Sequence, residues 1–573
     1  TIENTAAQVV QLYDNAKWFA PGVGSNAWVV SGNHTTSKLP VLAGDPHLVN
    51  NLPSNFFLAE LKGNHLAVKG ATIPGVPAII FGANEEISWA ATNLAADVQD
   101  LYQEQVNPNN HQQYLYQDQW NEFSYREETI NVAPKFPAIL SKKIKPITWK
   151  VRSSLHGPII TDVMGDTKTP LALRWTALDE TDKSIEAFID INYSSNWLEF
   201  KQALAKHHTP ALNFVYVDKG NNIGMIAAGS IPKRSVGQGV FTVAGWEKQN
   251  EWQSYILQEE MPQILNPTSG VLVSANNRIH SNSYPYVISN NWQPDYRANR
   301  ITNRLLNGIT HGIKFDMNQM ADIQSDVFSN QAAQMKTFII AIEPQNTQQR
   351  DMLAYLRDWD LEMDAESIAG AIFRSWVEEF TRLIVQDELA VDLTYIDRAN
   401  VLNREVNRSR PVFIGKIFNG QLTHWCNDRT TITTESCHNI ALKALDETYD
   451  KYALMLGKDI EDWQLSNVQQ VKFPHSGMSK LPLFKHLFNQ EKPSAGGPYT
   501  VNVAGSQYVK GEGYIKSLGA SYRQVVDMGH INEASFTVDI GQSGNLLSPN
   551  FDSFLELHQR VQLVPMVFNN KTK

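Results

Sequence analysis

Strand-like segments at both ends of the chain, separated by a helical block, most constrain what this sequence can fold into. From Ser25 to about residue 305, short apolar runs recur between clusters of Gly, Pro and Asn, which is typical of β-strands. From about 315 to 465 the apolar residues follow helical spacing, and beyond about 495 the strand pattern returns. We expect the two strand-rich ends to pair in one sheet system, with the helical block as an insertion. The strand-like runs include AWVVSG, PAIIFG, ISWAAT, LNFVYV, GVLVSA, YTVNVAG and ASFTVDIG.

Charge and hydropathy exclude two classes of partner. The 573 residues contain 49 Lys and Arg against 59 Asp and Glu, a formal net charge of −10, and no segment concentrates basic residues. Nucleic acids and anionic membranes are bound largely through clustered positive charge, so we expect neither as a partner. No apolar run reaches the roughly 18–20 residues that a membrane-spanning helix needs.

The chain has two cysteines, which lie close together in HWCNDRTTITTESCH. Cys426 and Cys437 could form a disulfide in an oxidising compartment, or they could be two buried free thiols. Zinc binding is not expected, because the C-x-x-C spacing of zinc sites is absent although His424 and His438 flank the pair.

The segment PGVGSNAWVVSG, residues 21–32, is the candidate reactive site. A serine hydroxyl needs a base to become a nucleophile, and the sequence has no G-x-S-x-G, Walker A or H-E-x-x-H motif. Cleavage between Gly24 and Ser25 would give Ser25 a free α-amine with a pKa of roughly 7.7–8, which can accept the hydroxyl proton. The alternative from these residues alone is a glycine-rich turn that leads into a strand.

A series of motifs resembles the penicillin acylase family of N-terminal-nucleophile hydrolases, and it covers nearly all of 25–573. The resemblance implies an α+β fold, an αββα sandwich of two antiparallel sheets between helices. It also implies a spacer at 1–24, a catalytic β-subunit at 25–573 with a helical insertion at about 315–465, and an α-subunit from the same precursor. Family members are periplasmic or secreted. The motifs, in chain order, are SNAWVVSG, LAGDPHL, PGVPAIIFGANEEISWAATNLAADVQDLY, HGPII, TPALNFVYVDKGNNIGMIAAGSIP, LVSANNRI, YRANRIT, GASYRQVVDM and GQSGNLLSPNF.

The same resemblance assigns catalytic roles. Ser25 matches the nucleophile, and the oxyanion hole would consist of the backbone N–H of Asn93 and the side-chain amide of Asn276. His47 matches a residue near the nucleophile's amine, with a role in positioning and autoprocessing. Arg300 matches an arginine that orders the second oxyanion asparagine, and Arg297 is the alternative for that role.

The resemblance also implies a structural calcium site and an acyl pocket. The segment ADVQD would bind Ca²⁺ through Asp97, the carbonyl of Gln99 and Asp100, and the carbonyl of Pro232 is a further ligand. Leu48 and Phe81 would line the acyl pocket. Phenylacetyl-preferring members have an aromatic residue where this chain has Leu48, so an aliphatic acyl group fits this chain better.

The sequence therefore predicts an amidohydrolase that cleaves an acyl-amide bond through Ser25 and an acyl-enzyme, with no organic cofactor. An N-acyl-homoserine lactone or an acyl-lipopeptide is the alternative substrate to a β-lactam. A different class of function is a homologue that stays uncleaved and binds ligand without turnover.

Overall fold

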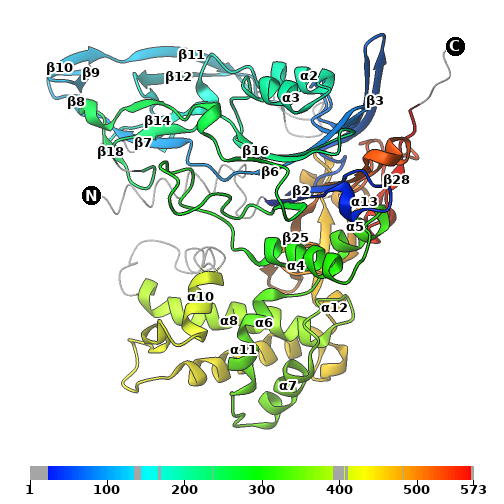
Figure 1. Ribbon diagram of the computed structural model, residues 1–573. Helices are drawn as coiled ribbons and strands as arrows, with labels where there is room; N and C mark the ends of the chain where they lie inside the picture. The colour runs from blue at the N-terminus through cyan, green and yellow to red at the C-terminus, as the bar shows by residue number, and fades with distance from the viewer. Residues whose placement is uncertain are drawn as a thin grey trace.

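The computed structural model describes residues 24–134, 144–164, 169–236, 238–390, 406, 411–481 and 483–568 (Figure 1). Apart from Gly24, the predicted spacer at 1–24 lies outside these described residues. The described chain forms two large sheets, several small sheets and a set of helices.

The first large sheet has ten strands and joins both ends of the chain. Strand β1 (Gly24–Val30) is buried at every residue and pairs with β2 (Val41–Val49) and β21 (Val271–Ser274). Because β2 also pairs with two C-terminal strands, β25 (Gly513–Ala520) and β26 (Tyr522–Asp527), the expected pairing of the strand-rich ends is confirmed. The other strands of this sheet are β22 (Gln469–Phe473), β23 (Gln490–Pro493), β24 (Gly505–Val509), β27 (Ser535–Val538) and β28 (Val564–Pro565).

The second large sheet has seven strands and stacks on the first. Side chains alternate along β1, so Ala27 and Val29 face this second sheet and share one apolar cluster with Trp89 and Phe214. In sheet order, the strands are β20 (Gln263–Leu265), β16 (Ile223–Ala228), β15 (Leu212–Asp218), β6 (Ile87–Asn93), β5 (Phe81–Asn84), β4 (Leu66–Thr72) and β3 (Phe57–Gly63).

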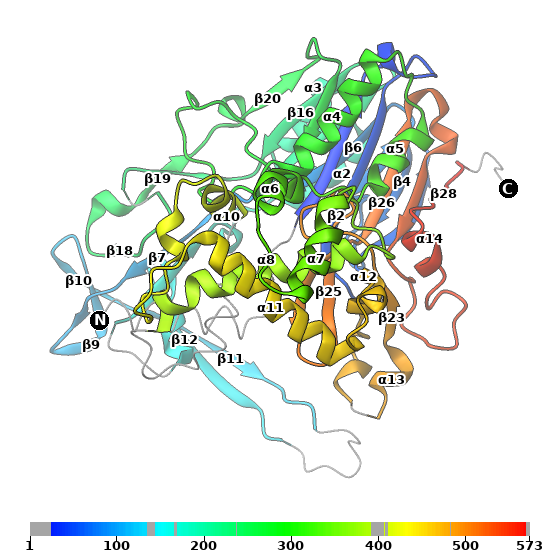
Figure 2. The same ribbon diagram turned by 90° about the horizontal axis from the view of Figure 1, so that it is seen from below.

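Helices cover the outer faces of both large sheets. Trp28 and Val30, the other face of β1, pack on α4 (Tyr296–Thr310) and α5 (Met317–Ser325), which cross that sheet in Figure 2. The seven-stranded sheet packs against α2 (Ser184–Tyr193) and α3 (Trp197–Leu204). The layers are thus helix, sheet, sheet, helix, so the predicted αββα sandwich of the α+β class is confirmed.

A helical block lies beside the sandwich, as Figure 1 shows. Between residues 296 and 468, every named element of the described chain is helical. The block has its own apolar core around Trp376 and Phe380. In the described part of the chain, no helix is long and apolar enough to cross a membrane. The block contains α6 (Asn330–Ile340), α7 (Thr347–Asp358), α8 (Ile368–Ala390), α10 (Pro411–Phe418), α11 (Cys437–Leu456) and α12 (Leu465–Val468).

Small sheets extend one end of the sandwich, and two short helices lie near the C-terminus. The strands are β7 (Gln99–Gln103), β8 (Val106–Asn107), β9 (Asn110–Tyr116), β10 (Gln119–Glu122), β11 (Ser124–Ile130), β12 (Ile147–Ser154), β13 (Gly157–Pro158), β14 (Leu171–Trp175), β17 (Pro232–Arg234), β18 (Val243–Ala244) and β19 (Trp252–Tyr255). The helices are α13 (Lys485–Phe488) and α14 (Leu555–Gln559).

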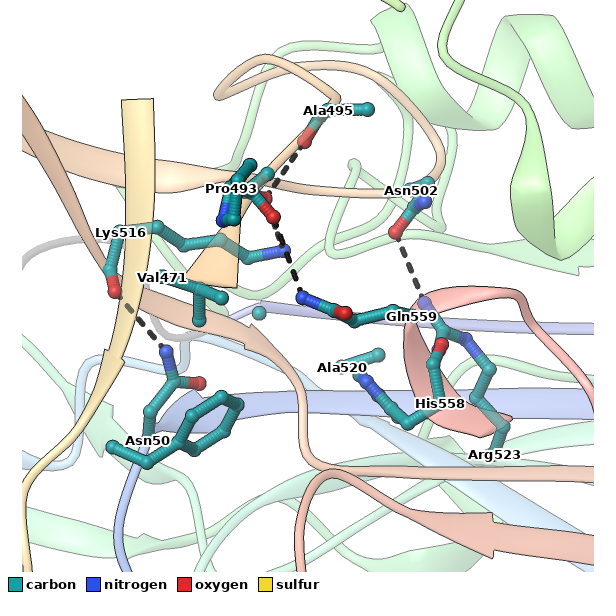
Figure 3. Close-up of a pocket in the computed structure, with 13 residues that line it drawn as sticks. Asn50, Val471, Pro493, Ala495, Asn502, Lys516, Ala520, Arg523, His558 and Gln559 are labelled. Atoms are coloured by element: carbon teal, nitrogen blue, oxygen red, sulfur yellow. Dashed lines mark hydrogen bonds between the residues drawn. The ribbon is translucent and has the colours of Figure 1, made fainter. Parts of the chain in front are cut away.

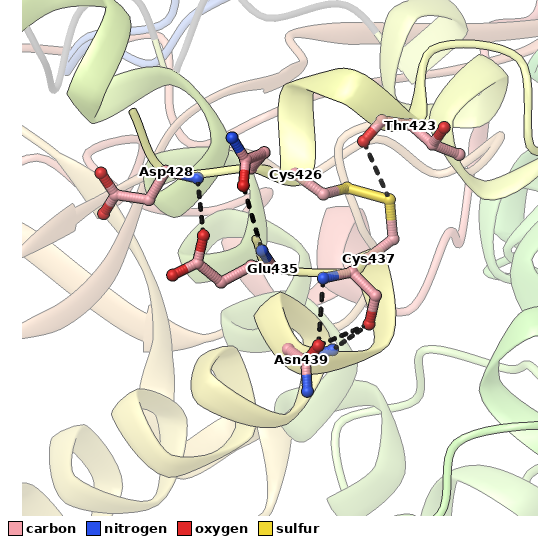
Figure 4. The surroundings of a disulfide bond; sticks show 8 residues. Thr423, Cys426, Asp428, Glu435, Cys437 and Asn439 are labelled. Atoms are coloured by element: carbon pink, nitrogen blue, oxygen red, sulfur yellow. Dashed lines mark hydrogen bonds between the residues drawn. A yellow bond between two sulfur atoms is a disulfide. The ribbon is translucent and has the colours of Figure 1, made fainter. Parts of the chain in front are cut away.

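The two cysteines form a disulfide between the 3₁₀ helix Thr423–Cys426 and the start of α11, which settles the choice that the sequence left open (Figure 4). The S–S distance between Cys426 and Cys437 is 2.03 Å. Two further bonds close the same loop, because the N–H of Asp428 donates to Glu435 Oε2 at 3.1 Å and the N–H of Glu435 donates to Asn427 Oδ1 at 3.1 Å.

We predict that replacing both cysteines by Ser lowers the free energy of unfolding by about 3 kcal/mol, since a short cross-linked loop restricts the unfolded chain by that amount. Urea unfolding of the double variant and of the reduced native protein measures the loss. Reduction of the double variant should have no further effect. Equal stability of the oxidised and reduced native protein would contradict the prediction.

Candidate active site

Ser25 lies at the buried beginning of β1, where the two large sheets meet. Its exposed fraction is 5%, and the β1–β2 register places Gly24 opposite His47. The Ser25 hydroxyl donates a hydrogen bond to the carbonyl oxygen of Gly24, the residue before it. The side chain that could act as nucleophile therefore touches the peptide group on its own N-terminal side.

A buried arginine holds the backbone around Ser25. Arg297 on α4 is 5% exposed, and its Nη1 donates to Ser25 O and to Asn26 Oδ1, both at 2.7 Å. Its Nη2 donates to Asn276 Oδ1 at 2.9 Å. Burial lowers the pKa of Arg297 to about 10, and the negative charge of Asp45 opposes that shift. The guanidinium thus remains a cation at neutral pH.

Asn276 connects the serine to the end of β6. Its Oδ1 accepts the Ser25 N–H at 2.7 Å, and its Nδ2 donates to the carbonyl oxygen of Asn93 at 2.8 Å. The Asn276 backbone has φ 64°, in the left-handed region that asparagine tolerates better than most residues. The structure thus brings together three residues that the sequence analysis singled out: Ser25, Asn93 and Asn276.

His47 lies in the same cluster, held by a carboxylate that the sequence analysis did not single out. Its Nε2 is 2.8 Å from Asp45 Oδ2, which also accepts a hydrogen bond from Asn26 Nδ2 at 3.1 Å. Burial is the largest cause that lowers the pKa of His47, with Asp45 opposing it, so the imidazole is neutral at neutral pH. Since alternate residues of a strand share a face, the pair Asp45 and His47 in LAGDPHL was the available signal.

Arg300 differs from this expectation, because in this structure its partner is Asp326 and not Asn276. Its guanidinium bonds Asp326, with Nε to Oδ2 at 2.9 Å, and stacks on Phe328 at 4.1 Å. Arg297 makes the expected contact with Asn276 instead. With 3.6 residues per turn, residues three apart differ by about 60° around the helix axis, and here only the earlier one faces the sheet junction.

Leu48 and Phe81 lie in the core between the two sheets. Phe81 is 7% exposed and Leu48 is half-buried, and both belong to the apolar cluster that also contains Phe56 and Tyr522. The ring centroids of Phe56 and Phe81 are 6.0 Å apart. Leu48 is next to His47 on β2, so this apolar wall begins beside the serine cluster.

The residues expected to bind calcium surround an arginine. Arg234 Nε is 2.6 Å from Asp100 Oδ2, and both side chains are buried. Its Nη2 donates to the Asp97 carbonyl oxygen at 2.8 Å, while Asp97 Oδ2 accepts two hydrogen bonds from Asn290, both at 2.9 Å. Burial raises the pKa of Asp97.

A calcium ion needs six to eight oxygen ligands, but a cation already neutralises this loop. Gln99 lies within this loop, and Pro232 begins the strand that contains Arg234. Within the described residues, no group of three or more His, Cys, Asp and Glu side chains could hold a metal ion. The residues therefore do not fit the expected calcium site.

We predict that Arg297→Ala destabilises the protein by about 3 kcal/mol, because three buried oxygens lose their donor. Arg300→Ala is the matched control and should cost less, since Arg304 still donates to Asp326 at 2.8 Å. Urea unfolding measures both values. An equal loss in the two variants would show that the buried network does not depend on Arg297.

We further predict that chelation with EGTA leaves the unfolding temperature unchanged, because Arg234 balances the charge of Asp100. Replacing Arg234 by Gln should lower the unfolding temperature, since Asp100 then loses its buried partner. Calorimetry with and without added Ca²⁺ measures both effects. Stabilisation of the native protein by calcium, with one ion bound per chain, would refute this interpretation.

Comparison with known proteins gives the same family as the sequence motifs, and the match extends over almost the whole chain. The family profile described as penicillin amidase matches residues 2–573. An acyl-homoserine lactone acylase, QuiP, from Pseudomonas syringae pv. tomato is 25% identical over 96% of this chain and 67% of its own length. Penicillin acylase 2 proenzyme from a Pseudomonas strain is 25% identical over 96% of this chain and 68% of its length. The chain thus spans about two thirds of these relatives.

A solved structure shares the fold. Thermostable penicillin G acylase from Alcaligenes faecalis superposes with a TM-score of 0.71 and 17% identity, and the match covers 95% of this chain and 96% of that chain. The profile match and the shared fold agree with the fold that the sequence motifs predicted, and the buried serine cluster lies on that fold. This chain belongs to the penicillin amidase family, the amide-bond hydrolases with the N-terminal-nucleophile hydrolase fold.

Proposed function

We propose that this protein is an acylase that cleaves an acyl-amide bond with Ser25 as its N-terminal nucleophile, after cleavage of the chain between Gly24 and Ser25. One observation carries the proposal: Ser25 contacts Gly24, Asn276 and Arg297 at one buried point, with Asn93 one hydrogen bond away. These residues are far apart in the sequence, and each lies in or next to one of the family motifs quoted above.

The first step is cleavage of the chain itself. The Ser25 hydroxyl attacks the Gly24 carbonyl carbon, the Gly24–Ser25 amide bond breaks, and the acyl group moves to Oγ as an ester. Water then hydrolyses the ester, which leaves the carboxylate of Gly24 and the free amine of Ser25. A side chain at residue 24 would crowd this step, because a Cβ there would lie 3.3 Å from Arg297 Nη2 and from Asn276 Oδ1.

His47 suits a supporting role in that cleavage. Asp45 accepts its Nε2–H, which leaves Nδ1 as the unprotonated nitrogen of the neutral ring. Nδ1 has no hydrogen-bond partner among the described residues, and a Cβ on Gly24 would lie 3.4 Å from it. Nδ1 is therefore positioned to accept a proton beside the scissile peptide.

In turnover the freed amine takes over as the base. It accepts the Ser25 hydroxyl proton, Oγ attacks the substrate amide carbon, and the amine product leaves the acyl-enzyme, which water hydrolyses. Arg297 binds Asn276 Oδ1 and so turns Nδ2 toward Asn93. This orientation supports an oxyanion hole of the Asn276 amide and the Asn93 N–H, where one donor contributes on the order of 10²–10³ in rate.

The substrate class follows from the acyl side of the site. Leu48 and Phe81 form an apolar wall beside the cluster, and the aliphatic Leu48 favours an unbranched acyl chain over phenylacetyl. Relatives named acyl-homoserine lactone acylase support an N-acyl-homoserine lactone as the second candidate beside a penicillin. An α-subunit from the same precursor, and a periplasmic or secreted location consistent with the disulfide, complete the proposal.

The test is the mass and N-terminal sequence of protein expressed with its full precursor. We expect a chain that begins Ser-Asn-Ala-Trp, and amidase activity that depends on it. Ser25→Ala should stay uncut and lose all turnover, whereas Ser25→Cys retains a nucleophile and should still be cut. A panel of acyl-chain lengths on homoserine lactone and on penicillin amides then identifies the acyl group. Ligand binding without turnover in the uncut native chain would favour the non-catalytic homologue instead.

A further inference from the structure

A polar cavity lies where β22, β25 and β26 of the ten-stranded sheet meet α14. Its volume is about 70 Å³, several times the roughly 10–15 Å³ that one buried water needs. Lys516 from β25, Arg523 from β26 and His558 from α14 line it, and Figure 3 shows them around one space. Among the described residues, no aspartate or glutamate lines this cavity.

Lys516 has few partners for a buried ammonium group. Its exposed fraction is 9%, and its side chain extends across the cavity in Figure 3. Nζ has three N–H donors, but within the described chain its one hydrogen bond is to Ser494 Oγ, at 3.3 Å. Burial lowers the pKa of Lys516 to about 7, so its charge depends on what fills the cavity.

The opposite wall supplies one more unsatisfied donor. Arg523 is 1% exposed, with Nη1 bonded to His558 O at 2.9 Å and Nη2 bonded to Asn502 Oδ1 at 3.0 Å. Arg523 Nε–H has no partner among the described residues, whereas burial lowers the pKa of His558, so its ring is neutral and its Nε2 is not a second donor. Buried donors of this kind are normally satisfied, so the wall lacks an acceptor.

Nearby carboxylates do not supply the missing acceptor. In the part of the chain that the structure describes, neither Lys516 nor Arg523 forms an ion pair. Asp45 and Asp539 act on Arg523 at longer range, and Asp539 also acts on Lys516, but burial raises the pKa of Asp539 to about 7, which weakens its charge. Asp45 is already bonded to His47 and Asn26. The cavity therefore has an excess of positive charge and of donors.

We propose that this cavity binds a small monovalent anion, of the size of chloride or formate, between Lys516 and Arg523 and beside the neutral ring of His558. The anion accepts hydrogen bonds from groups that the protein leaves unpaired and balances two buried cations. Its binding favours the protonated form of Lys516, so affinity falls as the pH rises above the pKa of that side chain. Arg523 is the link to the active site, because its charge also acts on His47.

The experiment titrates chloride into native protein held in gluconate at constant ionic strength. Unfolding temperature and ³⁵Cl NMR line width are the two readouts, and neither requires a substrate or depends on Ser25. We expect saturable stabilisation by chloride, bromide and formate, with binding weaker at about pH 8.5 than at about pH 6, by up to tenfold per pH unit.

The variants separate this site from general salt effects. Lys516→Met should weaken chloride binding at least tenfold, whereas Lys510→Met, an exposed lysine on the turn before β25, should leave it unchanged. If Lys516→Met does not fold, the pH dependence of chloride binding in native protein still tests the proposal. Equal binding at the two pH values, or an unchanged response in Lys516→Met, would contradict the proposal.

Discussion

One buried cation organises the centre of this molecule. Arg297 extends from helix α4 to the start of β1 and donates to oxygens of Ser25, Asn26 and Asn276. A guanidinium in an apolar interior is costly unless its donors are satisfied, and here its three partners are neutral oxygens. Asp45 supplies the compensating charge through Asn26 and not by direct contact. Arg297 therefore connects helix α4, strand β1 and the segment that contains Asn276.

The sequence predicted the layers well, since they depend on local pattern. Residues 27–30 alternate in the core, and the structure sends Ala27 and Val29 to one sheet and Trp28 and Val30 to the helices on the other side. That outcome needs only a strand period of two residues and apolar neighbours on both faces. The helical block followed in the same way from apolar spacing.

Side-chain partners were harder to predict, because they depend on where distant segments meet. The motif YRANRIT offers two arginines, and the sequence does not decide which one faces the serine. The sequence predicted a Ca²⁺ site at the loop ADVQD. The structure places a cation there, but it is the guanidinium of Arg234. The sequence showed that the aspartates of this loop need a positive partner. It did not show which one, because that partner lies on a strand more than a hundred residues away. No pattern in the sequence indicated the cluster of Lys516, Arg523 and His558.

The long sequence separation between Ser25 and its contacts has a consequence for the maturation of the protein. Ser25 meets Asn276 across 251 positions and Arg297 across 272, and β2 beside it pairs with strands beyond residue 512. Contacts of such range form late in folding. Under the proposed cleavage, an incomplete chain would lack the groups that cut it. Maturation would then act as a check on the whole fold, and a truncated or misassembled copy would stay inert.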